Sequence, residues 1–220
     1  MNENFEDLKS EFNLTDYQIK KFNSLFDALD AEKKGVLDYG NFLIHILRIK
    51  KRRAWDDRDP AFQEMVNLKN IIWNLLNLLE GTYIEGKLTK TNWIRFWGSV
   101  AKAISHGKAF QFGRAQSSTL NLPTGMIIPL MHSTFKTIGS YQSGTINKED
   151  FMIHLDGMEI PMSEEKVDEV WKTIVGDREV LELRVDEMEE LIAQWLLNTD
   201  ENDPLPGDWF ITGGFKVQWE

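Results

Sequence analysis

The residues that most clearly suggest a chemical role are the side chains with oxygen atoms in residues 30–41. They stand at positions 1, 3, 9 and 12 of a twelve-residue calcium loop: Asp30, Glu32, Asp38 and Asn41. Gly35 occupies position 6, where such a loop turns sharply. Position 5, however, holds the cation Lys34, and position 12 holds a neutral amide where a bidentate Glu is usual. Because calcium affinity depends on ligand charge and number, we expect weak Ca²⁺ binding at most in this loop.

A second segment, residues 139–150, repeats this arrangement with a different set of losses. It keeps candidate ligands at positions 5, 9 and 12: Ser143, Asn147 and Asp150. Positions 1 and 3 are Gly139 and Tyr141, which supply no carboxylate. Residues 81–92 keep Gly at position 6 but lack a carboxylate at positions 1, 3 and 12, and a segment near residues 177–183 is irregular. We therefore interpret all of these metal positions as vestigial.

Helical patterns of apolar residues flank each of these segments. The patterns predict helices over residues 15–29, 42–49, 71–79, 93–104, 126–138, 151–155, 164–175 and 188–197. A helix, a short polar loop with Gly and a second helix make an EF-hand. The predicted fold is therefore all-α and compact, with four EF-hand-like units in two paired lobes, since one hand cannot cover its own apolar face. Short β-bridges are expected between paired loops.

The chain divides by composition into four parts. Residues 1–105 are predicted to form the N-terminal pair of hands, and residues 124–199 the C-terminal pair. Residues 106–123 are rich in Gly, Ser, Gln and Asn and are interpreted as a linker. Residues 200–220 contain Pro and Gly and are not expected to form a regular helix. Their aromatic residues predict that this tail packs on the body.

Composition excludes several classes of protein. The 220 residues contain no Cys, which excludes disulfides, thiolate zinc sites and a Cys nucleophile. The net charge of −10 argues against nucleic acid as a partner. No apolar run is long enough to span a bilayer, and the acidic N-terminus lacks the features of a secretory signal. We expect a cytoplasmic monomer.

Several stretches resemble one family of EF-hand proteins. They are residues 26–42, 86–97, 122–123, 134–151, 194–200 and 206–210, including the run Gly86-Lys87-Leu88-Thr89-Lys90-Thr91-Asn92-Trp93. The sequence resembles the sarcoplasmic calcium-binding proteins, the calexcitins and the juvenile hormone diol kinase-like proteins, which share a fold with the coelenterazine-binding proteins. The resemblance implies two or three working calcium loops. This chain departs from that pattern at every loop.

The resemblance also implies a cavity for a bulky apolar ligand between the lobes. Candidate lining residues are Trp73, Phe96, Trp97, His132, Phe135, Tyr141, Trp171 and Trp195. The alternative is that these aromatic side chains belong to an ordinary core. On this basis we expect a non-enzymatic protein that binds a hydrophobic small molecule or a protein partner, with calcium binding largely lost.

Two other functions stay open at this stage. One is residual calcium sensing or buffering through the loop at 30–41 or the loop at 139–150. The other is a diol kinase-like phosphotransferase, because residues 81–87 fit the pattern GxxxxGK of a phosphate-binding loop. That motif needs a strand before it and Ser or Thr directly after its Lys. Here a helix is predicted before residue 81, and Leu88 follows Lys87. The basic run at residues 50–53 fits either a lipid-headgroup patch or the solvated end of a helix.

Overall fold

The computed structural model describes most of the predicted helices and all four bridging strands. The residues it describes are 5–77, 86–105, 131, 133–135, 137–138, 144–177, 181–184 and 187–212. The structure is mainly helical, with two small antiparallel strand pairs, as the sequence predicts. Among the described residues, no helix combines the length and apolar character needed to cross a membrane.

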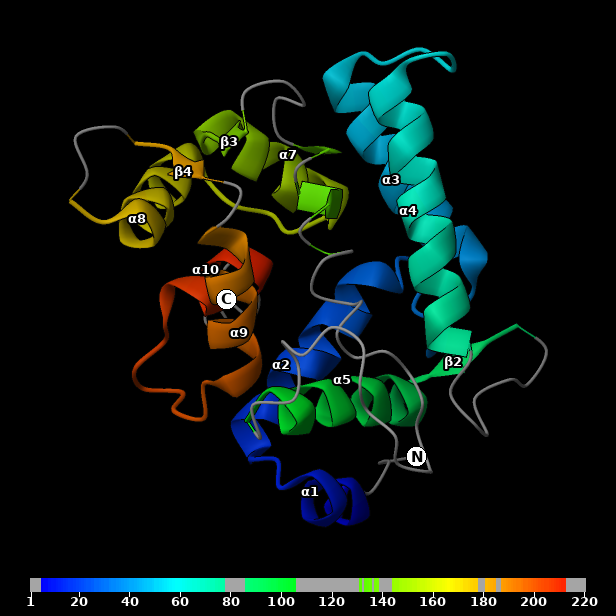
Figure 1. The fold of residues 1–220 in the computed structure, drawn as a ribbon, viewed down its shortest axis with the longest axis vertical. Helices are drawn as coiled ribbons and strands as arrows, with labels where there is room; N and C mark the ends of the chain where they lie inside the picture. The colour runs from blue at the N-terminus through cyan, green and yellow to red at the C-terminus, as the bar shows by residue number, and fades with distance from the viewer. Residues whose placement is uncertain are drawn as a thin grey trace.

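The first two hands pair through their loops (Figure 1). Hand one comprises α2 (Asp16–Leu29), β1 (Val36–Leu37) and α3 (Tyr39–Arg53). Hand two comprises α4 (Pro60–Asn77), β2 (Leu88–Thr89) and α5 (Lys90–Ser105). Strands β1 and β2 are antiparallel, and Leu37 stands opposite Leu88 with both side chains fully buried. The apolar residue at position 8 of each loop therefore closes the pair.

The second pair follows the same plan. Its described elements are β3 (Thr145–Ile146), α7 (Lys148–Gly157), α8 (Glu164–Val175), β4 (Leu183–Arg184) and α9 (Met188–Leu197). Ile146 stands opposite Leu183, and both side chains are buried. This register puts Leu183 at position 8 of the fourth loop, so the Gly normally found at position 6 is replaced by Leu181.

Helices α3 and α7 extend beyond the predicted residues 42–49 and 151–155, and three further differences are larger. Helix α4 begins at Pro60, well before residue 71, because Pro is well suited to the first position of a helix. Helix α1 (Glu6–Phe12) precedes the first hand and was not predicted. The expectation that the tail has no regular helix was wrong for residues 206–212, which form α10 (Pro206–Thr212). Pro206 again occupies the first helical position.

The two halves share one hydrophobic core. Trp97 of α5 and Trp195 of α9 meet edge to face, with ring centroids 5.2 Å apart. Trp195 also meets Phe22 of α2 at 5.5 Å. Helix α10 lies against α9, and it also contacts α8 and α2 (Figure 1). The C-terminal helix therefore joins the second pair of hands to the first.

Candidate functional site

An apolar cavity lies inside this shared core. Its volume is about 80 Å³, and its walls come from both pairs of hands and from α10. The described lining residues are Leu25, Leu29, Phe42, His45, Lys69, Ile72, Leu76, Trp93, Phe96, Trp97, Met131, Thr134, Phe135, Ile138, His154, Met158 and Ile211. Because most of these side chains are apolar, the cavity suits a hydrophobic occupant with a few polar groups.

Three of the aromatic residues singled out in the sequence line this cavity: Phe96, Trp97 and Phe135. Three others do not, because neighbouring rings occupy the space beside them. Trp73 packs on Phe42 and Tyr39, while Trp195 packs on Trp97 and Phe22. Trp171 stacks on Phe151 at 5.5 Å in the second pair. His132 and Tyr141 lie outside the described residues.

The polar lining residues were missed from the sequence. His45 on α3 and His154 on α7 are 3% and 6% exposed. The ring nitrogens of His45 have no hydrogen-bond partner within the described part of the chain. Those of His154 have none of good geometry there, and interaction with the backbone of Ile211 and Phe210 acts to raise its pKa against the effect of burial. Lys69 on α4 is partly buried. One feature of the sequence could have identified such a residue, namely a polar residue on the apolar face of a predicted helix. His45 is an example, because it shares a helix face with Phe42 and Ile49.

Burial favours the neutral form of all three groups. It lowers the pKa of His154 to about 4 and that of His45 well below its usual range. The positive charge of Lys69 lowers the pKa of both histidines further. Burial also lowers the pKa of Lys69, to about 8. At neutral pH the cavity therefore holds two neutral imidazoles beside a mostly charged amine.

The pKa of His154 predicts a loss of stability in acid. The unfolded chain takes up a proton near the ordinary pKa of 6.5, whereas the folded protein does so only near 4. Above pH 6.5 the titration of His154 therefore does not reduce the free energy of unfolding. As the pH decreases from 6.5 to 4, it lowers that free energy by on the order of 3 kcal/mol. In urea unfolding measured across this range, His154→Phe should lose less stability than the native chain. Equal acid losses in the two proteins would contradict the assignment.

In loop one, the candidate metal ligands form hydrogen bonds with other groups of the protein. Both carboxylate oxygens of Asp30 accept hydrogen bonds, from the backbone N–H groups of Lys34 at 3.0 Å and Gly35 at 2.6 Å. The Asn41 side chain accepts from the N–H of Asp38 at 2.9 Å and donates to the carbonyl of Leu29 at 3.1 Å. Asp38 in turn caps α3 by accepting from the N–H of Asn41.

The same loop also contains a positively charged side chain, that of Lys34. Lys34, at position 5, forms an ion pair with Glu32 at position 3. This contact raises the pKa of Lys34, chiefly through its hydrogen bond to Glu32. The described donor set of loop one is poorly matched to Ca²⁺, because an ammonium group lies among the ligand positions and the Asn41 oxygen already accepts the Asp38 N–H at the start of α3.

In loop three, an arginine from the first pair of hands contacts the last ligand position. Asp150 is 2% exposed and forms an ion pair with Arg53, the last residue of α3. The same guanidinium donates to the carbonyl of Ile138. Asp150 and Asn147 also form a capping box at the start of α7, with hydrogen bonds of 2.9 and 3.0 Å. Ser143 lies outside the described residues. No described group of three His, Cys, Asp or Glu residues is placed to hold a metal ion.

The basic run at the end of α3 is largely used within the protein. Lys50 pairs with Asp57, Arg52 pairs with Asp156 at 2.7 Å, and Arg53 pairs with Asp150. These pairs favour the interpretation of a capped helix end over that of a lipid-headgroup patch. Most of the GxxxxGK motif, residues 81–85, lies outside the described residues.

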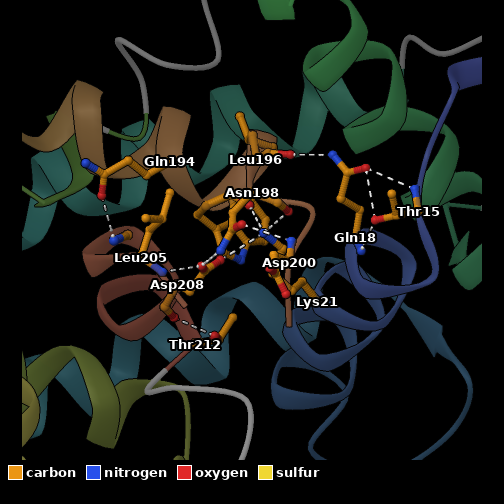
Figure 2. A network of polar contacts seen from close by, with 12 residues as sticks. Thr15, Gln18, Lys21, Gln194, Leu196, Asn198, Asp200, Leu205, Asp208 and Thr212 are labelled. Carbon is orange, nitrogen blue, oxygen red and sulfur yellow. Dashed lines mark hydrogen bonds and ion pairs between the residues drawn. The ribbon is translucent and has the colours of Figure 1, made fainter. Parts of the chain in front are cut away.

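A buried polar network fixes α10 beside the cavity (Figure 2). The ammonium of Lys21 on α2 lies 2.8 Å from the carboxylate of Asp208 on α10, and neither side chain is more than 1% exposed. Lys21 also donates to the carbonyls of Trp195 and Asn198. Asp208 accepts from the Asn198 side chain at 2.5 Å and from the Leu205 N–H at 2.9 Å. The network holds in place the helix that contributes Ile211 to the cavity wall.

The arrangement is similar to that of several solved structures. Coelenterazine-binding protein from Renilla muelleri, in a calcium-loaded apo form, aligns with a TM-score of 0.61 and 12% identity over 88% of this chain and 94% of that chain. A sarcoplasmic calcium-binding protein from amphioxus gives 0.59 and 16% over 90% and 98%. The calcium-regulated photoprotein mitrocomin from the jellyfish Mitrocoma cellularia gives 0.61 and 16% over 92% and 93%.

Sequence comparison adds nothing to these structural matches. No protein-family model and no curated protein matches the chain. Identities of 12–16% establish a shared architecture and not a shared activity. The chain has the EF-hand fold of the sarcoplasmic calcium-binding proteins, the coelenterazine-binding proteins and the photoproteins.

Proposed function

We propose that this protein is a non-enzymatic binding protein that holds an apolar small molecule in the cavity between its two pairs of hands. The observation that carries the proposal is an apolar cavity bordered by buried polar atoms with no hydrogen-bond partner in the described residues, on His45, His154 and Trp97. Such atoms cost stability when buried alone, so a site that keeps them is suited to a ligand that pairs with them. A neighbour of the same fold is named for binding coelenterazine.

The volume restricts the ligand. Pockets for drug-sized molecules usually measure about 300–1,000 Å³, whereas this cavity measures about 80 Å³. The occupant is therefore a small or slender molecule, or one whose binding displaces side chains of the wall. A protein partner is the less favoured alternative, because only four large apolar side chains of the described residues are exposed, Leu47, Ile71, Leu181 and Leu197, whereas the cavity is lined mostly by apolar side chains.

Calcium has no role in the proposed function. Loop one is braced by the Lys34–Glu32 pair and by the capping role of Asn41, and the last ligand position of loop three is paired with Arg53. The capping bonds of Asn41 and Asp150 join each of these loops to the helix that follows it. Residual calcium sensing and phosphotransfer are not supported by any contact of the described residues.

A pair of tryptophan substitutions on adjacent positions of α4 tests the proposal. Ile72 is 8% exposed and lines the cavity, whereas Ile71 is 43% exposed. In calorimetric titration with 1-octanol, Ile72→Trp should weaken binding by about tenfold or more because the new ring fills the space. Ile71→Trp should bind like the native chain.

The same titration separates the calcium alternative. Octanol affinity should be equal in EDTA and in about 1 mM calcium, since the loops hold their own cations. Failure of the native protein to bind either octanol or its carboxylate analogue octanoate, or equal weakening by both substitutions, would overturn the cavity as the binding site. A calcium-dependent affinity would favour the sensor alternative.

A further inference from the structure

The polar groups around the cavity are all able to donate a hydrogen bond, and none of them is an anion. They are Lys69, His45, His154, Trp97 and Thr134, and no Asp or Glu stands among the described lining residues. A purely apolar ligand would fill the space and leave buried donors such as the Trp97 indole and the His45 ring unpaired, which costs free energy at each one. The lining therefore specifies a ligand that carries acceptors.

Trp97 gives the strictest requirement. Its side chain is 4% exposed, and its indole nitrogen has no hydrogen-bond partner in the described part of the chain. An indole N–H can only donate, so nothing but an acceptor satisfies it. His45 and His154, neutral at pH 7, each have one ring nitrogen that donates and one that accepts. Each imidazole therefore has one nitrogen that can donate to an acceptor on a ligand.

Lys69 adds the charge. Burial is the only cause that shifts its pKa, and no neighbouring carboxylate opposes the shift. Its field reaches both imidazoles, since it lowers the pKa of His45 and of His154. At neutral pH the amine is mostly protonated, so one positive charge without a described carboxylate partner borders an apolar space. A single negative charge on the ligand matches it, and a dianionic phosphate would be left half uncompensated.

Resting on the proposed binding function, we propose that the ligand is an apolar molecule bearing one carboxylate, which pairs with Lys69 and accepts hydrogen bonds from Trp97 and the two histidines. A carboxylate has two oxygens with about four acceptor sites, which matches this set of four donors. Its hydrocarbon part contacts apolar lining residues such as Leu25, Leu29 and Phe42. The ligand class is therefore that of a fatty acid or a similar apolar acid.

Calorimetric titration at pH 7 with octanoate and with 1-octanol tests the proposal, because the two differ only in the head group. The native protein should bind octanoate about tenfold or more tightly than octanol. Lys69→Met should lose about tenfold in octanoate affinity and bind octanol within about twofold of the native value. Lys69→Arg keeps the charge and should retain the preference. Lys172→Met on α8, which removes an exposed lysine remote from the cavity lining, should behave like the native protein.

The outcomes separate this inference from the proposed function. Equal affinities of native protein for octanoate and octanol would overturn the carboxylate and leave the apolar site standing. Binding of neither compound would overturn both. A third outcome would come from incubating the protein with octanal and borohydride and analysing it by mass spectrometry. If octanal forms an adduct at Lys69 and octanoate does not bind, the ion pair is wrong. Lys69 would then form an imine with an aldehyde, with loss of water. The native chain alone decides the first two outcomes, so a Lys69 variant that fails to fold does not spoil the test.

Discussion

Replacing Asp208 with alanine is expected to lower the free energy of unfolding by about 3–5 kcal/mol. The substitution leaves the ammonium of Lys21 buried with a 0% exposed side chain and no opposing charge. Burial already lowers the pKa of Lys21, and Asp208 is the group that opposes this shift. The substitution also removes the carboxylate that accepts hydrogen bonds from the Asn198 side chain and the Leu205 N–H. Urea unfolding followed by Trp fluorescence measures the change.

Two controls show whether the loss comes from an unpaired buried charge. The double substitution Lys21→Met with Asp208→Leu removes both charges, and it should recover much of the stability because well-packed apolar side chains replace buried pairs at little cost. Asp168→Ala breaks the exposed pair between Lys148 and Asp168 and should cost at most about 1 kcal/mol. If Asp208→Ala costs no more than Asp168→Ala, the network does not secure α10.

Gly207→Ala is expected to dislodge α10. A Cβ at this position would lie 2.0 Å from the carbonyl oxygen of Leu191 and 2.9 Å from Cβ of Gln194. The first of these is backbone of α9 and cannot turn aside, so the two helices must separate. Separation breaks the hydrogen bond from the Gly207 N–H to the Gln194 side chain. We expect a loss of at least about 3 kcal/mol, at the upper end of the cost of overpacking.

The loss should extend to the cavity. Helix α10 carries Phe210, which is fully buried between Phe151 and His154, and Ile211, which forms part of the cavity wall. Gly207→Ala should therefore weaken octanol binding as well as lower the unfolding midpoint in urea. Gly40 is the matched control, since it too is the second residue of a helix. Its closest neighbour is the Asp38 side chain, whose Oδ1 would lie 2.8 Å from the new Cβ and caps α3. Gly40→Ala should therefore cost no more than the loss of a helix cap, about 1 kcal/mol. Similar losses in both variants would contradict the close approach of α10 to α9.

The pairing of the hands was predictable because it depends on local pattern. Gly35, Gly86 and Gly144 each adopt a positive φ, as position 6 requires, and Leu37, Leu88 and Ile146 occupy the bridging positions two residues later. These features repeat at a fixed spacing and can be recognised from one sequence. The capping boxes at Asp38 and Asn147 depend likewise on residues three apart.

The cavity's polar residues and the tail network could not be predicted in this way. Lys21 and Asp208 are separated by 187 positions, and no local pattern joins them. His45 and His154 come from different pairs of hands and meet only when α3 packs against α7. Trp73, Trp171 and Trp195 lie on helices, as Trp97 does, and tertiary packing decides which ring faces the cavity. Aromatic content therefore predicted a large core but not its empty part.

The contact between Arg53 and Asp150 has a consequence for regulation. Arg53 is covalently part of α3, so the positive charge beside loop three has a local concentration fixed by the chain and not by the surrounding solution. A diffusible ion leaves when its concentration falls, and this is what makes an ion-binding loop a sensor. A tethered guanidinium has no second state of that kind. This contact between the two pairs of hands is therefore constitutive and does not follow the ion concentration of the solution.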